Sequence, residues 1–223
     1  MISIETARAW YPNTDPVHGF EHVLRVYRLA EHLSEAEGAD WEIVQAAVLL
    51  HDAEGAAQSE SLPGGKDEME KPNSRQDHHQ SSAEFARLIL AAEGWPEQRI
   101  NAVTHAIRSH RFRDEREKPH TLEAQILFDA DKLDAIGAIG VARAVAYAAR
   151  AGQPAYAEAS PRFIETGERE PGEPHSAYHE YLFKLRHLQE RLYTQTARLI
   201  AAERHQYMTD FFLRLGQEIK GIL

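Results

Sequence analysis

Four residues of the 223-residue chain have side chains of the types that can bind a divalent metal and lie within or beside apolar segments, where such side chains are unusual. His51 and Asp52 end an apolar run, Asp131 interrupts the most apolar stretch, and His22 lies in an earlier amphipathic segment. A buried carboxylate must be paired, hydrogen-bonded or metal-bound, because an isolated charge in an apolar setting is costly. Two imidazoles and two carboxylates form a mixed nitrogen and oxygen set for one divalent ion, so we expect these four residues to be its ligands.

The two neighbouring residues His51 and Asp52 restrict where such an ion can lie. Adjacent residues do not share a helix face, so both can bind only an ion that lies over the helix end. His22 and Asp131 must then arrive from other helices. The alternative is a helix end that reaches solvent, with His51 interacting with the helix dipole.

Three aspartates stand close together in the run 129–134. Asp131 and Asp134 are three residues apart and share a helix face, whereas Asp129 is turned by about 200° from Asp131. We expect Asp131 to bind the metal and Asp129 to point outward or cap. Asp134 is expected to orient a histidine or water, or to act as a general base. The alternative for Asp134 is a salt bridge to a neighbouring arginine or lysine.

The spacing of apolar residues predicts the elements that must position these side chains. Gly38 is a candidate C-cap of one helix and Asp40 a candidate N-cap of the next, joined to it by a tight turn. No alternating β pattern occurs, so the predicted class is all-α. Helices are expected at 2–12 (a short helix or arm), 19–37, 40–52, 82–93, 96–110, 122–150, where we expect one buried central helix, and 176–220.

Two long segments rich in polar residues, glycine and proline, 54–77 and 151–174, separate these helices. The first is long for a structureless connection in a compact domain, and it is either a lid beside the site or a surface insertion. Both segments are candidate lids. The charged stretch 111–120 is expected to be a solvated loop, with phosphate binding as the alternative.

Composition limits the classes of partner. The chain has 35 acidic and 25 basic residues, a net charge of −10, and no cysteine. An acidic chain is unsuited to gripping a nucleic-acid backbone, and the lack of cysteine excludes disulfides and thiolate catalysis. No segment is long and apolar enough to span a bilayer, and the start shows no leader. We expect a soluble, cytoplasmic protein that binds neither nucleic acid nor membrane.

The order of His22, then His51-Asp52, then Asp131 in an all-helical frame resembles the HD-domain metal-dependent phosphohydrolases. His22 stands in the form His-x-x-Arg-Val that recurs in them. The run DADKLDAIGAIG within 122–143, with the tail from His179 to Met208, is similar to a bacterial branch that includes nucleotide pyrophosphohydrolase-like members. The resemblance implies one HD-type domain over 1–223, with a helical-bundle core at about 18–150 and C-terminal helices at about 176–220 packed on it.

The resemblance also implies that His22, His51, Asp52 and Asp131 bind one catalytic ion. We expect Mn²⁺ first, and Mg²⁺, Fe²⁺, Co²⁺, Ni²⁺ or Zn²⁺ as alternatives. We expect three further histidines to line the pocket and to contact phosphate or the attacking water: His78, His79 and His110. The alternatives are that they bind a second metal or that they are ordinary surface residues. The adjacent histidine pair of two-metal relatives is absent at 109–111.

The implied activity is metal-dependent hydrolysis of a phosphate ester or anhydride in a small nucleotide-like substrate, with nucleoside triphosphate pyrophosphohydrolysis first. Phosphoryl transfer depends on positioning and charge neutralisation, so nearby cations matter, and Lys132 and Arg25 are the candidates. A structural salt bridge is the alternative for Arg25, and solvent exposure is the alternative for Lys132. The rival activities are 5′-nucleotidase, phosphodiesterase and a non-catalytic nucleotide-sensing module. The protein is expected to be a monomer or a homodimer.

Overall fold

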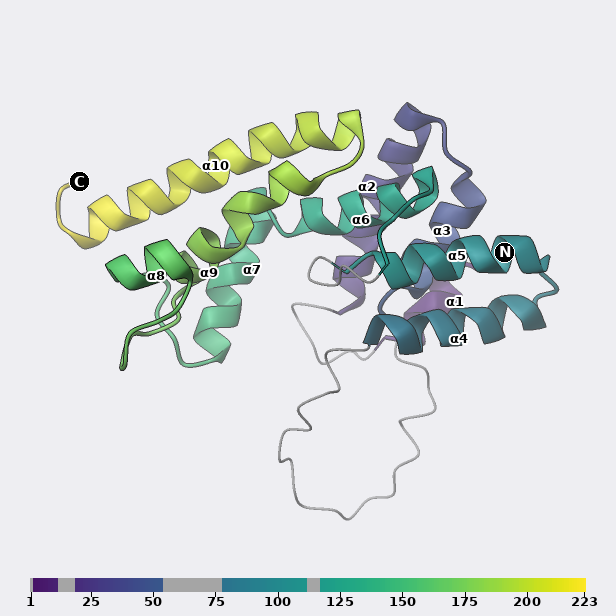
Figure 1. Ribbon diagram of the computed structural model, residues 1–223, viewed down its shortest axis with the longest axis horizontal. Helices are drawn as coiled ribbons and strands as arrows, with labels where there is room; N and C mark the ends of the chain where they lie inside the picture. The colour runs from purple at the N-terminus through teal and green to yellow at the C-terminus, as the bar shows by residue number, and fades with distance from the viewer. Residues whose placement is uncertain (1, 12–18, 54–77, 112–116) are drawn as a thin grey trace, which may run out of the picture. The chain divides into compact units, whose positions relative to one another are not determined.

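Every regular element in the described part of the chain is a helix (Figure 1). The computed structural model describes residues 2–11, 19–53, 78–111 and 117–223, and no strand occurs in these ranges. The all-α prediction is confirmed. The candidate lid at 54–77 and part of the charged connection lie outside the described residues.

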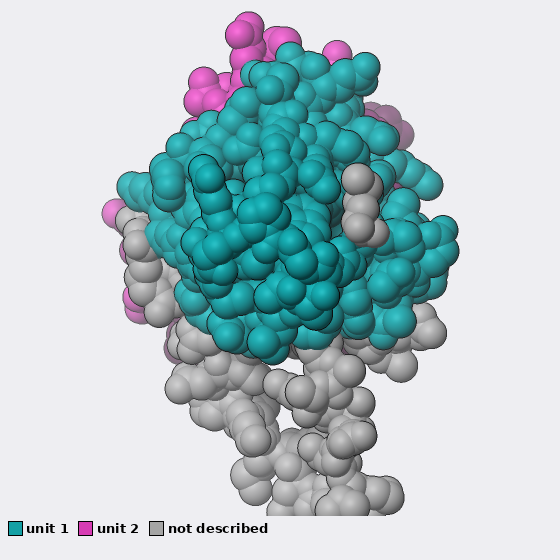
Figure 2. Space-filling view, turned by 90° about the vertical axis from the view of Figure 1, so that its right-hand side faces the viewer, with its two compact units in different colours: residues 1–130 teal, residues 131–223 magenta. Residues whose placement is uncertain are grey.

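The chain divides into two compact units, residues 1–130 and 131–223, coloured teal and magenta in Figure 2. The division falls inside helix α6 (Leu122–Asp134) and is not at a loop. The single domain over 1–223 stays a prediction.

Unit 1 begins with the short helix α1 (Ile4–Arg8), followed by α2 (Phe20–Glu37) and α3 (Trp41–Leu50). Gly38 ends α2 in the left-handed conformation, with φ of 77°, which glycine adopts without a steric cost. The carboxylate of Asp40 accepts hydrogen bonds from the backbone N–H groups of Glu42 and Ile43, at 3.1 and 3.4 Å. Both predicted caps are confirmed, and together they turn α3 back against α2.

The pair α4 (His78–Ala92) and α5 (Glu97–Ser109) completes the described part of unit 1 before α6, and the two helices lie side by side (Figure 1). Helix α3 packs against both of them as well as against α2. Arg99 of α5 binds the carboxylates of Asp40 and Glu42 at 2.9 and 2.6 Å, which joins α5 to the start of α3. Because helices surround α3, its residues 46–50 are all buried.

The stretch 122–150 forms two helices, so the prediction of one long helix was wrong. Helix α6 ends at Asp134, and α7 (Gly137–Arg150) begins after an extended residue, Ile136. Gly137 has φ of 76°, which a straight helix does not allow. A Cβ at Gly137 would lie 2.9 Å from Cγ of Arg204, so the glycine is also needed for close packing.

Unit 2 continues with α8 (Pro161–Thr166), α9 (Ala177–Phe183), the 3-10 helix η2 (Leu185–Arg191) and α10 (Gln195–Ile219). The predicted loop 151–174 therefore contains a helix. Helix α10 packs against α7 and η2 through a face of mostly small side chains, while Leu199 and Tyr207 are exposed. That buried face consists of Ala197, Ala201, Met208, Phe212 and Gly216.

Among the described residues, no helix combines the length and the apolar character that crossing a membrane requires.

Candidate metal centre

The end of α3 places two predicted ligands. His51 is the C-cap residue of α3 and is completely buried. Its Nδ1 lies 2.8 Å from the carbonyl oxygen of Val48, one turn earlier. A carbonyl oxygen can only accept, so Nδ1 carries the proton and donates it. In a neutral ring this leaves Nε2 as a lone-pair donor to a metal.

Three histidines surround the carboxylate of Asp52. The Nε2 atoms of His51 and His22 lie 3.5 and 4.0 Å from Oδ2. The Nε2 atom of His110 lies 3.7 Å from Oδ1. All three imidazoles are nearly inaccessible to solvent, and each comes from a different helix or helix end. Unit 1 therefore brings His22, His51 and Asp52 close together.

His110 repeats the arrangement of His51 at the end of α5. Its Nδ1 lies 2.5 Å from the carbonyl oxygen of Ile107, three residues earlier. The two rings meet edge to face, with centroids 5.2 Å apart. Two helix ends thus use the same local hydrogen bond to fix the tautomer and to aim Nε2 at one carboxylate.

The last turn of α6 carries the fourth predicted ligand, Asp131. One ligand atom each from His22, His51 and Asp131 can be chosen so that all three lie within 4.8 Å of one another. The side chain of Asp131 is about four-fifths buried. These three residues and Asp52 supply the mixed nitrogen and oxygen donors that divalent transition metals accept.

The donor chemistry at His51 fits a cation. Its buried Nε2 has no hydrogen-bond partner among the described residues, and the carboxylate oxygen it faces is also an acceptor. Two acceptors that face each other in a buried place repel, and a buried polar atom without a partner is rare in a native protein. A divalent ion held by His51 and Asp52 would satisfy both atoms, so the residues present fit a metal.

The aspartates Asp129 and Asp134 of α6 are both buried. Asp129 was expected to point outward or cap, but it is completely buried, because α6 has apolar buried residues around its whole circumference. Asp134 is also buried, and Oδ2 accepts a hydrogen bond of 2.5 Å from the Arg143 guanidinium. The structure therefore shows for Asp134 the salt bridge that was the alternative to a catalytic role.

The other four predicted residues belong to α6, α2 and α4. The ammonium group of Lys132 contacts the carboxylate of Asp131, and the side chain is about nine-tenths buried rather than extended into solvent. Arg25 is half-buried on α2, one turn after His22. His79 is completely buried in the first turn of α4. The side chain of His78 lies outside the described residues.

Sequence reasoning missed two polar residues that contact the α3 end. The hydroxyl of Tyr11 donates to the Leu49 carbonyl oxygen at 3.0 Å, and Oγ of Ser82 donates to the Ala53 carbonyl oxygen at 3.3 Å. Burial raises the pKa of Tyr11 well above its usual value, and the negative charge of Asp52 adds to this, so the hydroxyl stays a donor. Tyr11 is one aromatic residue in the short segment 2–12, so no helical periodicity could have identified it as a contact of α3.

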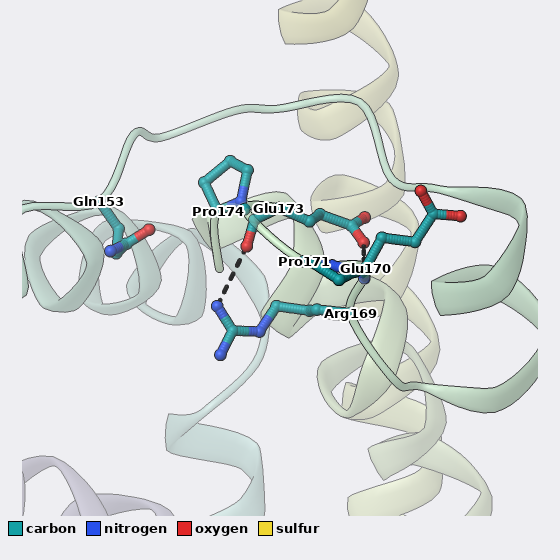
Figure 3. A pocket seen from close by; sticks show the side chains of 7 residues that line it. Gln153, Arg169, Glu170, Pro171, Glu173 and Pro174 are labelled. Atoms are coloured by element: carbon teal, nitrogen blue, oxygen red, sulfur yellow. Dashed lines mark hydrogen bonds between the residues drawn. The ribbon is translucent and has the colours of Figure 1, made fainter.

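Unit 2 has a surface hollow of about 560 Å³, formed by the turn 169–174 and Gln153 (Figure 3). Most of its lining is exposed. The carboxylate of Glu173 already accepts hydrogen bonds from Ser160 and from the backbone N–H of Glu170. No residue predicted for the metal site lines this hollow.

A family model described as HD domain matches residues 19–136, from the start of α2 to the residue before α7. The chain belongs to the HD-domain family. The Bacillus subtilis protein YpgQ, described as uncharacterized, is 31% identical to this HD-domain chain over 208 residues, which cover 92% of this chain and 86% of YpgQ.

Solved structures share the fold over nearly the whole chain. The crystal structure of Bacillus subtilis YpgQ in complex with ADP has a TM-score of 0.69 and 28% identity, covering 99% of this chain and 100% of that one. An HD-superfamily hydrolase from Bacillus thuringiensis has a TM-score of 0.66 and 27% identity, covering 97% and 96%. A predicted HD-superfamily hydrolase from an uncultured Thermotogales bacterium has a TM-score of 0.61 and 27% identity, covering 96% and 90%.

Proposed function

We propose that the protein is a divalent-metal-dependent hydrolase that cleaves a phosphate ester or anhydride of a nucleotide. The observation that carries this proposal is the convergence of three buried imidazole nitrogens on the carboxylate of Asp52, with Asp131 as a further donor. The similarity to HD-superfamily hydrolases supports hydrolysis as the class of reaction.

In this proposal His22, His51, Asp52 and Asp131 hold the ion. When bound, a divalent ion supplies Lewis acidity towards a phosphoryl oxygen and activates water at neutral pH. The hydrogen bond from His51 Nδ1 to the Val48 carbonyl oxygen holds the ring so that Nε2 faces the proposed ion. Mn²⁺ is the ion we propose first, because nitrogen and oxygen donors suit it and it supports phosphoryl chemistry.

Cationic and neutral side chains around the ligands are proposed to hold the phosphate. Lys132 offsets the charge of the Asp131 carboxylate that it contacts, which lowers the repulsion felt by an incoming anion. Arg25 lies half-buried on the same helix as His22 and is the proposed second cation. His110 faces the other oxygen of Asp52 and, with His79 and His78, is proposed to contact phosphate or the attacking water.

The proposed substrate class is a nucleotide, with nucleoside triphosphate pyrophosphohydrolysis first. It is supported by the likeness to YpgQ, a relative whose crystal structure contains ADP and which aligns over almost the whole chain. The product decides between the candidate reactions. Pyrophosphate release from a triphosphate supports the first candidate, phosphate release from a 5′-nucleotide supports a nucleotidase, and cleavage of a diester supports a phosphodiesterase.

The test is a panel of nucleoside mono-, di- and triphosphates and a phosphodiester, given to metal-stripped protein with Mn²⁺, Mg²⁺, Co²⁺ or Ni²⁺ added back. We expect turnover with at least one ion, and its loss in Asp52→Ala. Failure of every ion and substrate, in protein that still binds a metal, would contradict the proposal.

A nucleotide-sensing module is the second candidate, and the same ADP complex favours it, since bound ADP is compatible with recognition without turnover. Sensing predicts tight nucleotide binding by the metal-loaded protein with no product over many hours. Hydrolysis predicts that bound triphosphate is converted.

A further inference from the structure

The carbonyl groups at the end of α3 distinguish it from an ordinary helix end. The last carbonyls of an α-helix have no partner within the helix and are usually satisfied by water or by a cap. Here the end of α3 is buried, since residues 46–51 have at most 3% of their surface exposed. Water is therefore a poor source of partners for these groups.

Protein groups satisfy the carbonyls one after another. Val48 accepts from Nδ1 of His51 at 2.8 Å, and Leu50 accepts from the backbone N–H of Ala53 at 3.2 Å. Between them, Leu49 accepts from the hydroxyl of Tyr11 at 3.0 Å. These three hydrogen bonds hold the chain at the start of the His51-Asp52 turn, and among the three the contact to Leu49 comes from a distant part of the sequence.

Residues 2–11, which we call the N-terminal arm, hold Tyr11 in place. The ring of Tyr11 packs against Phe20, with centroids 5.5 Å apart, and Tyr11 is 95% buried. The guanidinium of Arg8 lies 4.5 Å from the centre of the Phe20 ring. Helix α1 begins with a side-chain cap from Ser3 and packs against α3. The arm is therefore a docked element with a buried polar contact.

We propose that Tyr11 is a positioning residue of the metal centre, and that the N-terminal arm is part of that centre. The hydroxyl fixes the Leu49 carbonyl, which precedes His51 by two residues, and so fixes the direction in which His51 and Asp52 present their ligand atoms. This inference rests on the proposed metal site but not on any particular substrate.

Packing alone does not account for a tyrosine at this position. The aromatic contacts with Phe20 need only a ring, which phenylalanine supplies equally well. A buried hydroxyl is costly unless it is hydrogen-bonded, and the acceptor here belongs to the metal-binding turn. Supporting groups around metal ligands have large effects, since their removal typically weakens metal binding or activity by about 10- to 100-fold.

Ser82 of α4 supplies a second contact to the same turn. Its hydroxyl donates to the carbonyl of Ala53, the residue after Asp52, at 3.3 Å, and Ser82 is 98% buried. Tyr11, which follows α1, and Ser82 of α4 therefore contact the chain on the two sides of His51-Asp52. A variant of each residue tests the same idea independently.

The experiment compares Tyr11→Phe and Ser82→Ala with the wild-type chain, using Co²⁺ alone as the probe. The matched control is Tyr27→Phe, which removes a half-buried hydroxyl that accepts a hydrogen bond from Gln45 at 3.3 Å. Measurements are the Co²⁺ dissociation constant, the visible absorption spectrum of bound Co²⁺, and the thermal midpoint of the metal-free protein.

We expect Tyr11→Phe to weaken Co²⁺ binding by about 10-fold or more and to change the Co²⁺ spectrum, because the ligand geometry shifts. Ser82→Ala should change the spectrum in the same way, and Tyr27→Phe should match the wild type. If Tyr11→Phe binds Co²⁺ within twofold of the wild type with an unchanged spectrum, the positioning role of Tyr11 is wrong, whatever Ser82→Ala shows. A lower thermal midpoint with wild-type binding and spectrum would likewise overturn it.

Failure of this inference is distinguishable from failure of the proposed function. Wild-type protein that binds Co²⁺ but hydrolyses no phosphate compound contradicts the hydrolase proposal and leaves the Tyr11 comparison intact. Protein that hydrolyses nucleotides equally well with Tyr11→Phe, and binds Co²⁺ equally well, contradicts the inference alone.

Discussion

The imidazole of His51 donates a 2.8 Å hydrogen bond from Nδ1 to the carbonyl oxygen of Val48, three residues earlier on the same helix. This contact decides the chemistry of the other ring nitrogen. With Nδ1 protonated, Nε2 of the neutral ring is an acceptor, and it faces the Asp52 carboxylate at 3.5 Å. The helix itself therefore prepares His51 to bind a cation.

The first prediction separates the two nitrogens of His51. In His51→Asn the side-chain amide can replace the Nδ1 donor but does not reach the position of Nε2, whereas His51→Gln can place an oxygen near it. We expect His51→Asn to lose metal affinity by about 100-fold or more, and His51→Gln to retain part of it. Mn²⁺ titration of metal-stripped protein measures both. Equal affinity of His51→Asn and the wild type would show that Nε2 is not a ligand.

The second prediction concerns the buried ion pair between Asp134 and Arg143. Removing one partner leaves a charge buried, so we expect Asp134→Asn and Arg143→Met each to lower the free energy of unfolding by about 3 kcal/mol. The double variant should lose less than the sum of the two. Chemical denaturation of the three variants gives these values.

Turnover of the same variants distinguishes the ion pair from a catalytic role of Asp134. If the ion pair is the role of Asp134, both single variants keep similar turnover per folded, metal-loaded molecule. Loss of turnover in Asp134→Asn alone, with Arg143→Met active, would instead favour the general-base role.

The third prediction uses the sign of a stability change at Gly140. Helix propensity alone predicts that Gly140→Ala stabilises the protein by about 1 kcal/mol. A Cβ there would instead collide with the carbonyl oxygen of Ala135 and lie 2.6 Å from Cε of Met208. We therefore expect destabilisation by about 1–3 kcal/mol. The control is Ala146→Gly at an exposed position of α7, where the change in the free energy of unfolding reflects helix propensity alone. A Gly140→Ala variant that is more stable than the wild type would contradict the observed packing of α7.

The fourth prediction is a pH dependence in unit 2. Hydrogen bonds from the backbone of Ser160, and further ones from Glu170 and His179, lower the pKa of Glu173 from 4.5 to about 2. A carboxyl group with a lowered folded pKa stabilises the folded state above its unfolded pKa, and this contribution disappears as the pH falls. The stability difference between wild type and Glu173→Gln should therefore be constant above pH 4.5 and shrink between about 4.5 and 2.

Thermal midpoints measured across that pH range test the fourth prediction, with Glu165→Gln at an exposed position of α8 as the control. A difference between wild type and Glu173→Gln that does not change with pH would show that Glu173 is not held as a carboxylate by these contacts.

Local signals were sufficient for the helices that frame the centre. Gly38 and Asp40 are caps whose effect depends only on neighbouring backbone, so the boundaries of α2 and α3 follow from the sequence. His22 lies between the apolar residues Phe20 and Val23 of α2. The order of His22, His51-Asp52 and Asp131 also resembles the HD-domain proteins, so the place of His22 beside the α3 end could be expected.

The break between α6 and α7 could not be predicted from local sequence. The segment 135–140 consists of alanine, isoleucine and glycine, and its two glycines weaken a helix without specifying where it ends. The space beside Gly137 is filled by Arg204, far along the chain. Arg204 donates to the Leu133 carbonyl at 2.6 Å and occupies the space beside Gly137. The burial of Asp129 and the contact of Tyr11 with α3 were missed for the same reason, since they depend on residues distant in the sequence.

The most direct test of the central claim is the metal content of the protein after equilibration with Mn²⁺ and removal of unbound ion. Wild-type chain should retain about one Mn²⁺, as expected for the single set formed by His22, His51, Asp52 and Asp131. Asp52→Ala should retain almost none, and Asp210→Ala, at an exposed position of α10, should match the wild type. Equal Mn²⁺ retention by Asp52→Ala and wild type, or none by the wild type, would contradict the metal centre.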